Sequence, residues 1–386
     1  MSAVFSVPSC IVMGSQAATQ LAAHLLRLKI RRILVVTDAF MVSSGIVPRV
    51  LDPLAAAGIS ASVFDGVQPD PTTQNAHDGL ALYRSSGAEA VVAIGGGSPI
   101  DAAKAIAVLT TNPGPLSAYE GYHRIPAAGA ILVAIPTTAG TGSEVTRVAV
   151  ITDTKRQVKM MLLDQHLLPT VALVDYELSL SMPRPLTAHV GLDTLTHGIE
   201  AYVSLKASGM TDPVALSCIR LVSEHLVNAW QEPHNLTARA GMMLAATQGG
   251  MAFANSSVCL IHGMSRPLGA VFHIPHGLSN AMLLPAVTRF SLPGAVARYA
   301  AIARIMGLAG DGADETVAVD ALVAGLEQLN LQLQVPRIRE TPGITLTRFE
   351  SSLLKMAQDA LASGSPANNP LIPTAADIVQ LYREAW

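Results

Sequence analysis

The chain has 386 residues, of which 50% are hydrophobic and only 14% are charged, and its formal net charge is -3. This charge balance, without a long run of Lys or Arg, excludes a protein that holds nucleic acid mainly through phosphate contacts. No apolar run reaches the roughly 18 to 20 residues that span a bilayer, so we expect no membrane partner. The length exceeds that of most single cores and favours two domains.

The first 26 residues carry no charged side chain, but Pro8 and Gly14 interrupt them and the positive region of a signal peptide is missing. We interpret them as a strand pair followed by a helix. Cys10, Cys218 and Cys259 are far apart and odd in number, which argues against a disulfide framework and predicts a cytoplasmic protein. The mean hydropathy is +0.40, and few charged residues are available to cover the surface of a monomer. This composition favours a homodimer or a larger homo-oligomer.

The first half of the chain alternates strand and helix patterns. Continuous apolar strands are expected at 31–40, 60–67, 88–98 and 127–138, and helices between them include 73–85 and 100–109. Continuous rather than alternating hydrophobicity indicates strands buried on both faces, so we predict a parallel α/β sheet. A polar hairpin and one more short strand between 148 and 175 complete this half.

After residues 181–185, Ala, Leu and Met recur at helical spacing to the end of the chain. The second half is therefore predicted to be all-helical. We place the two domains at 1–180 and 181–386.

Two glycine-rich turns each follow a buried strand. The first, GGGSPIDAAK at 95–104, opens a helix, and this context lets backbone N–H groups approach a phosphate. Ser98 is predicted to be the N-cap, with Asp101 completing a capping box. The second turn, at 136–146, adds five hydroxyls. Glycine turns are also ordinary loops, but two of them on one sheet suit a pyrophosphate and a ribose. The candidates are Gly95, Gly96, Gly97, Ser98 and Asp101, and then Thr137, Thr138, Thr141, Ser143 and Thr146.

Asp38 ends an early strand. A carboxylate there accepts from a ribose 2′-hydroxyl and repels a 2′-phosphate, which points to NAD rather than NADP. It precedes the glycine turn, whereas the standard dinucleotide fingerprint places the acid after it. The alternative interpretation is an ordinary turn residue.

Asp193 and His197 are four residues apart in a predicted helix, so their side chains project from one face. His262 and His276 follow later, each beside a glycine, with a third imidazole at His273. A hydrogen-bonded histidine is the common alternative. However, Arg266 is the only Lys or Arg between Arg239 and Arg289, and buried ionisable groups in such apolar surroundings favour a bound cation.

These segments together resemble the iron-containing (group III) alcohol dehydrogenase family over nearly the whole chain. The resemblance rests on FDGVQPDPT (64–72), the two glycine turns, GLDTLTHGIEAY (191–202) and HGMSRPLGAVFHIPHG (262–277). It implies a dehydroquinate synthase-like fold, with an NAD-binding α/β domain, a helical metal domain and an active site in the cleft between them. It also implies that Asp193, His197, His262 and His276 bind a divalent metal, usually Fe²⁺. Lys159 and Leu178 are further expected cofactor residues.

The ligand types also suit Zn²⁺ and other divalent metals, so they do not select iron. The family commonly has a second histidine four residues after the one at His262, and this chain has Arg266 there. His273 then becomes the candidate for proton relay. Arg266 either pairs with Asp212 or Glu200 or binds the acidic end of a substrate.

The expected function is hydride transfer between NAD(H) and a small primary alcohol, diol or aldehyde. The alternatives within the family are reductases of an acidic aldehyde or of maleylacetate, and glycerol dehydrogenases. The alternatives outside the family are a dehydroquinate-synthase-type lyase, a metal hydrolase and a non-catalytic binding protein. The lyase substrate needs several Lys and Arg near the metal, where this chain has only Arg266.

Overall fold

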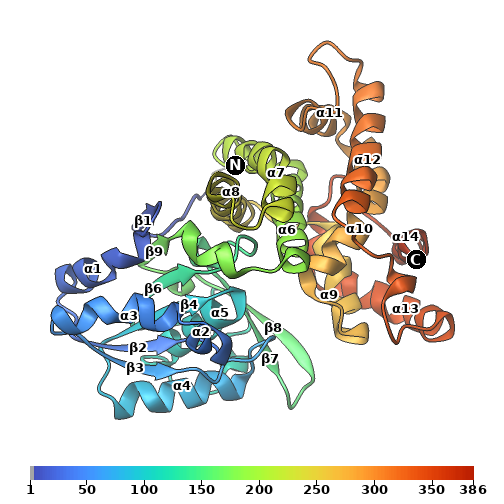
Figure 1. Ribbon diagram of the computed structural model, residues 1–386. Coiled ribbons are helices and arrows are strands. Elements are labelled where there is room, and N and C mark those ends of the chain that lie inside the picture. Colours follow the sequence, from blue (N-terminus) through green and yellow to red (C-terminus); the bar gives the residue numbers. More distant parts are fainter. Residues whose placement is uncertain (1–3) are drawn as a thin grey trace. The chain divides into compact units, whose positions relative to one another are not determined.

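The computed structural model describes residues 4–386 (Figure 1). Its internal contacts divide them into two compact units. The α/β unit is Ser6–Ser181, and the helical unit is Met182–Trp386 together with residues 4 and 5.

The α/β unit contains a six-stranded, wholly parallel sheet, as the continuous apolar strands predict. The strand order across the sheet is β1, β9, β6, β4, β2, β3. The bounds in that order are Cys10–Met13, Val171–Val174, Ile131–Pro136, Ala90–Gly95, Arg32–Val36 and Ser60–Phe64.

Helices cover both faces of this sheet and create two separate cores (Figure 1). Along β2, Ile33 and Val35 belong to the core under α1 and α3, and Leu34 and Val36 belong to the core under α4 and α5. Successive side chains of a strand point to opposite faces, so a strand between two helical layers is apolar at every position. The helices are α1 (Leu21–Arg27), α2 (Ala39–Ser43), α3 (Ile46–Ala56), α4 (Thr73–Ser85) and α5 (Gly97–Leu109).

The predicted polar hairpin is present as β7 (Val148–Asp153) and β8 (Val158–Leu163), which pair antiparallel. The short β5 (Gly121–Tyr122) extends it to a three-stranded sheet. The predicted strand pair in the first 26 residues is wrong for the described residues 4–26. They contain the single strand β1, whose parallel partner is β9, with Cys10 opposite Val171.

The helical unit contains no strand in residues 182–386, in agreement with the prediction. Its helices are α6 (Arg184–Val203), α7 (Asp212–Gln231), α8 (Leu236–Asn255), α9 (Leu260–Phe272), α10 (His276–Ser291), α11 (Val296–Ile305), α12 (Glu315–Gln332), α13 (Leu346–Ala362) and α14 (Ala375–Ala385). Helix α6 is buried on nearly all sides from Thr187 to Val203, which is typical of a central helix. Within residues 4–386, every helix is too short or too polar to cross a membrane.

Candidate active site

Both glycine turns lie at the carboxyl ends of adjacent parallel strands, the first after β4 and the second after β6. The predicted capping by Ser98 is wrong. Helix α5 begins at Gly97 with Gly96 as the N-cap, so Ser98 already lies in the first helical turn. Asp101 makes no capping box either, because its carboxylate accepts from Ser143 Oγ at 2.7 Å and from the Val150 N–H at 2.9 Å. The aspartate therefore joins α5 to the second turn.

The two turns face each other at close range. A Cβ atom on Gly97 would lie 2.9 Å from Thr141 Cγ2, and one on Gly96 would lie 3.2 Å from Thr138 Oγ1. Side chains at these two positions would push the turns apart. The arrangement leaves the first N–H groups of α5 beside the Thr138 and Thr141 side chains, which is the environment that a phosphate group requires.

Lys104 fixes the second turn from within the protein. Its fully buried ammonium donates to Ser143 Oγ at 3.0 Å, Thr146 Oγ1 at 2.9 Å and the Val148 carbonyl at 2.7 Å. Burial lowers the pKa of Lys104 to about 8, against the opposing effect of the carboxylates of Asp101 and Glu144. The hydroxyls of Ser143 and Thr146, predicted to contact the cofactor, thus bind this lysine. The available sequence signal was Lys104 in a helical stretch whose only other charged residue is Asp101.

Asp38 follows β2 and caps α2, because its Oδ1 accepts from the Met41 N–H at 2.9 Å. The strand that follows β2 in the chain, β3, lies on one side of the β2–β4 pair, and the sheet strand that follows β4, β6, lies on the opposite side. The crevice at such a change of direction, outside the carboxyl ends of β2 and β4, is where open parallel sheets bind ligands. Asp38 and the first glycine turn flank it, and the Thr37 hydroxyl joins them by donating to the Ile94 carbonyl at 2.8 Å.

Three other predicted cofactor residues have different surroundings. Lys159, on β8, pairs with Asp70 at 2.6 Å. Leu178 is buried in the core under α1 and α3. Thr137 is buried, and its Oγ1 has no hydrogen-bond partner among the described residues.

Four helical residues predicted as metal ligands lie in the helical unit. Oδ1 of Asp193 is 3.5 Å from His262 Nε2, 3.8 Å from His276 Nε2 and 3.7 Å from His197 Nε2. One ligand atom each from Asp193, His262 and His276 lies within 4.8 Å of the others. The ring of His197 stacks on that of His262, with centroids 4.8 Å apart. The structure thus brings together three predicted ligands and places the fourth beside them.

Close packing of two helices explains why a glycine follows His276. His276 is the first residue of α10, and a Cβ atom on the next residue, Gly277, would lie 2.6 Å from the His189 carbonyl of α6. Glycine allows the start of α10 to contact the backbone of α6. This contact positions His276 opposite Asp193.

Glu200 orients His262 and was not predicted as a site residue. Its Oε2 is 2.6 Å from His262 Nδ1 and accepts from the Cys259 N–H at 2.8 Å, and its Oε1 accepts from the Ile261 N–H at 2.6 Å. A carboxylate at Nδ1 places the ring proton there and leaves the Nε2 lone pair for a metal. Glu200 follows Asp193 by seven residues, so the helical spacing already placed both on one face.

Mutual attraction keeps these buried groups charged without a cation. Burial opposes protonation of His262, but Glu200 and Asp193 outweigh it and raise the pKa of His262 to about 9. Burial likewise disfavours the charged form of Asp193, and the surrounding imidazoles, His197 first among them, hold the pKa of that carboxyl well below its usual range. The site is a concentrated set of donors that binds positive charge.

The two carboxylates considered as partners of Arg266 have closer partners of their own. Asp212 pairs with Arg298 at 2.6 Å, and Glu200 holds His262, whereas the Arg266 guanidinium donates to Ser365 Oγ at 3.3 Å. Both carboxylates are already satisfied by closer groups. His273 is exposed and caps the end of α9 with a φ of 58°, a left-handed conformation that histidine tolerates better than most residues.

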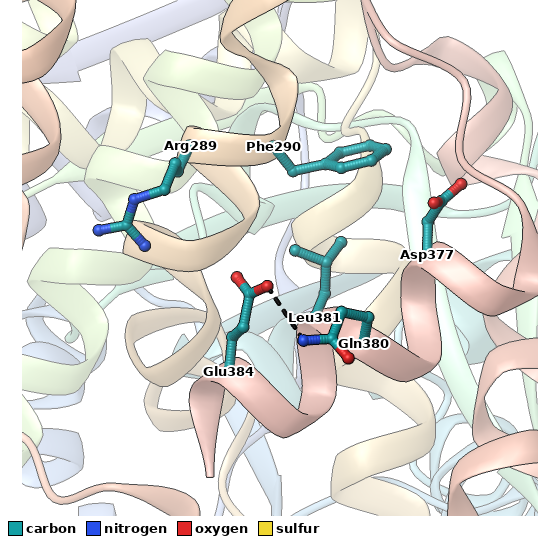
Figure 2. A pocket seen from close by; sticks show the side chains of 6 residues that line it. All are labelled: Arg289, Phe290, Asp377, Gln380, Leu381 and Glu384. Carbon is teal, nitrogen blue, oxygen red and sulfur yellow. Dashed lines mark hydrogen bonds between the residues drawn. The ribbon is translucent and has the colours of Figure 1, made fainter.

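A surface depression between α10 and α14 is a separate feature (Figure 2). It is lined by Arg289, Phe290, Asp377, Gln380, Leu381 and Glu384. Arg289 already pairs with Glu327, and the Gln380 amide donates to Glu384 at 3.4 Å. The depression contains none of the predicted site residues.

Comparison with known proteins agrees with both halves of this description. The family model "Iron-containing alcohol dehydrogenase" matches residues 8–176, and the C-terminal model of the Fe-containing alcohol dehydrogenase family matches residues 187–386. An NAD-dependent methanol dehydrogenase of Bacillus methanolicus is 35% identical, covering 99% of each chain. An NADPH-dependent butanol dehydrogenase of Clostridium saccharobutylicum is 37% identical, covering 95% of this chain and 93% of the other.

A crystal structure of a 1,3-propanediol oxidoreductase matches with a TM-score of 0.97 and 35% identity, covering 100% of both chains. These similarities confirm the predicted fold and do not favour the lyase, the hydrolase, the binding protein or the acidic-substrate reductases. The chain belongs to the iron-containing alcohol dehydrogenase family and is an oxidoreductase of the kind that uses a nicotinamide cofactor and a divalent metal.

Proposed function

We propose that this protein transfers a hydride between NAD(H) and a small primary alcohol, diol or aldehyde at a metal held by Asp193, His197, His262 and His276. The observation that carries the proposal is the meeting of one ligand atom each from Asp193, His262 and His276 within 4.8 Å. The donor types fit, since a carboxylate and neutral imidazoles bind Fe²⁺ and Zn²⁺ alike. Such a metal polarises the oxygen of the substrate.

The surrounding residues have defined tasks in this proposal. Glu200 holds the tautomer of His262, and Asp193 supplies the negative charge of the site. The half-exposed side chain of His276 leaves an open approach for a small substrate. His273, exposed at the end of α9, is the proposed proton relay, and a role of Arg266 at the substrate remains a prediction.

In the α/β unit, the first turn of α5 and the side chains of Thr138 and Thr141 are proposed to hold the pyrophosphate. Asp38 is proposed to accept from the ribose, because its Oδ1 already caps α2 and its Oδ2 remains for a ligand. Lys104 acts by shaping the second turn. Relatives of similar identity are named for NAD and for NADPH, so the preference here rests on Asp38.

We also propose a cytoplasmic homo-oligomer. Three free cysteines suit a reducing compartment, and the helical unit exposes large apolar side chains such as Leu205, Val317 and Leu331. Light scattering coupled to gel filtration is expected to give a mass of at least twice 40.2 kDa. A single-chain mass at micromolar concentration would contradict the oligomer.

His262→Ala is expected to lower metal affinity by more than about 100-fold, beyond the loss seen when a group that only orients a ligand is removed. Turnover should fall with the metal content. Metal content after dialysis and alcohol oxidation with NAD measure the two effects. The control is His234→Ala, which removes an exposed imidazole. Full metal content in the His262 variant would show that the ligands are assigned wrongly.

Glu200→Gln is expected to weaken metal binding by about 10–100-fold, because an amide cannot accept all three hydrogen bonds that the carboxylate accepts. Competition with a chelator measures the change. Glu224→Gln, on the exposed side of α7, is the matched control. Unchanged affinity in Glu200→Gln would mean that the carboxylate does not orient the ligand.

Asp38→Asn is expected to raise kcat/KM with NADP by about tenfold or more, which corresponds to about 1.4 kcal/mol of relieved repulsion. Asparagine still caps α2, so the change isolates the charge. Initial rates with both cofactors test it, and Asp52→Asn on the exposed side of α3 is the control. If the wild-type enzyme already uses NADP as well as NAD, the proposed contact between Asp38 and the ribose is wrong.

A further inference from the structure

Asn280 lies one helical turn after His276 on α10 and is completely buried. Its amide Nδ2 is 2.6 Å from Asp193 Oδ1, 3.1 Å from His262 Nε2 and 3.3 Å from His276 Nε2. A single atom therefore contacts one ligand atom of each of the three grouped residues. None of the sequence patterns singled out this side chain.

The amide nitrogen of Asn280 contacts the same three atoms that a bound cation would contact. An amide nitrogen carries two hydrogens, each with a partial positive charge, and no lone pair that accepts. Asp193 Oδ1 accepts from this amide, and the Nε2 atoms of His262 and His276 offer it a lone pair when those ring positions carry no proton. A divalent cation bound to the same three atoms would take these lone pairs and repel the amide hydrogens.

The other amide atom supports a second orientation. Asn280 Oδ1 is buried and has no hydrogen-bond partner among residues 4–386. A buried polar atom without a hydrogen-bond partner is unfavourable, because it has lost its contacts with water without replacing them. A half turn about the Cβ–Cγ bond exchanges the oxygen and the nitrogen. The oxygen would then face the Asp193 carboxylate, which is unfavourable unless a cation lies between them.

We propose that Asn280 is an additional, metal-dependent ligand whose amide reverses when the site takes up a cation. Without metal, its nitrogen holds the carboxylate and the imidazoles together. With metal, its oxygen turns toward the cation and adds a neutral donor to the four predicted ligands. The inference rests on the proposed metal site and concerns a residue outside that ligand set.

The test uses metal-free full-length protein titrated with Co²⁺ against a competing chelator, without any assay of activity. Asn280→Leu removes both amide atoms and is expected to bind Co²⁺ about 10–100-fold more weakly. Its visible absorption per cobalt should change as well, because one oxygen donor is lost.

Asn280→Asp supplies an anionic oxygen and is expected to bind Co²⁺ more tightly than the wild type. Its metal-free form should melt at a lower temperature, because two carboxylates then face each other.

Asn330→Leu is the matched control. Its amide donates to the Ala281 carbonyl at 2.7 Å and its oxygen also lacks a partner, but it contacts no predicted ligand. It should lower stability without changing the cobalt spectrum. Wild-type affinity and spectrum in Asn280→Leu, or no tighter binding in Asn280→Asp, would overturn the proposal for Asn280. The proposed function would still stand if the wild type bound one Co²⁺ that His262→Ala lost, and a wild type without cobalt binding would overturn both.

Discussion

The site in the helical unit depends on the hydrogen bonds of one buried carboxylate. Glu200 lies on α6, yet its acceptors satisfy the N–H groups of Cys259 and Ile261 at the start of α9 and the ring of His262. The side chain thereby serves as the cap that α9 does not obtain from its own N-cap residue. Because a carboxylate near a helix N-terminus is stabilised by the helix dipole, the same contact fixes the helix and the ligand. Two helices are held in register by a group that the chemistry also requires.

Lys104 has the corresponding position in the α/β unit. Its ammonium donates to two hydroxyls of the second glycine turn and to the Val148 carbonyl at the start of β7, so a loop of small polar residues is held in place from the protein interior. Removing one partner of a buried charge costs about 3–5 kcal/mol, which is a large part of the stability of a domain. In both units, a buried charged side chain holds in place the loop or helix end that carries predicted site residues.

Much of the fold could be predicted from local patterns. The helix expected at 73–85 is present with those bounds, because Thr72 and Asn75 form a capping box that the sequence encodes within four residues. Continuous apolar runs likewise predicted the parallel sheet, and the polar run after residue 148 predicted the hairpin. Residue types and apolar surroundings already favoured a cation near Asp193, His262 and His276, and the family resemblance gave them as one ligand set. Nothing in their spacing alone brings α6, α9 and α10 together.

The errors have one physical origin. The capping roles given to Ser98 and Asp101 and the strand pair in the first 26 residues were inferred from residue type or nearby sequence. The two carboxylates considered for Arg266 were chosen in the same way. In each case a group from elsewhere in the chain supplied the competing interaction: Val150 and Ser143 for Asp101, β9 for β1, and Arg298 for Asp212. Glu200 and Asn280 were missed for the same reason, because their importance comes from long-range hydrogen bonds rather than from periodicity.

The pairing of β1 with β9 also affects the order in which the chain folds. Cys10 meets Val171, so the N-terminal strand has no partner until most of the α/β unit has been synthesised. Contacts between residues so distant in sequence close late, because the intervening chain must first lose its freedom. Because β9 lies between β6 and β1 in the sheet, β1 can pair only once β9 is in place. Strand β1 is thus synthesised well before its partner, and until β9 is available its apolar residues are open to chaperones or to the strand edges of other chains.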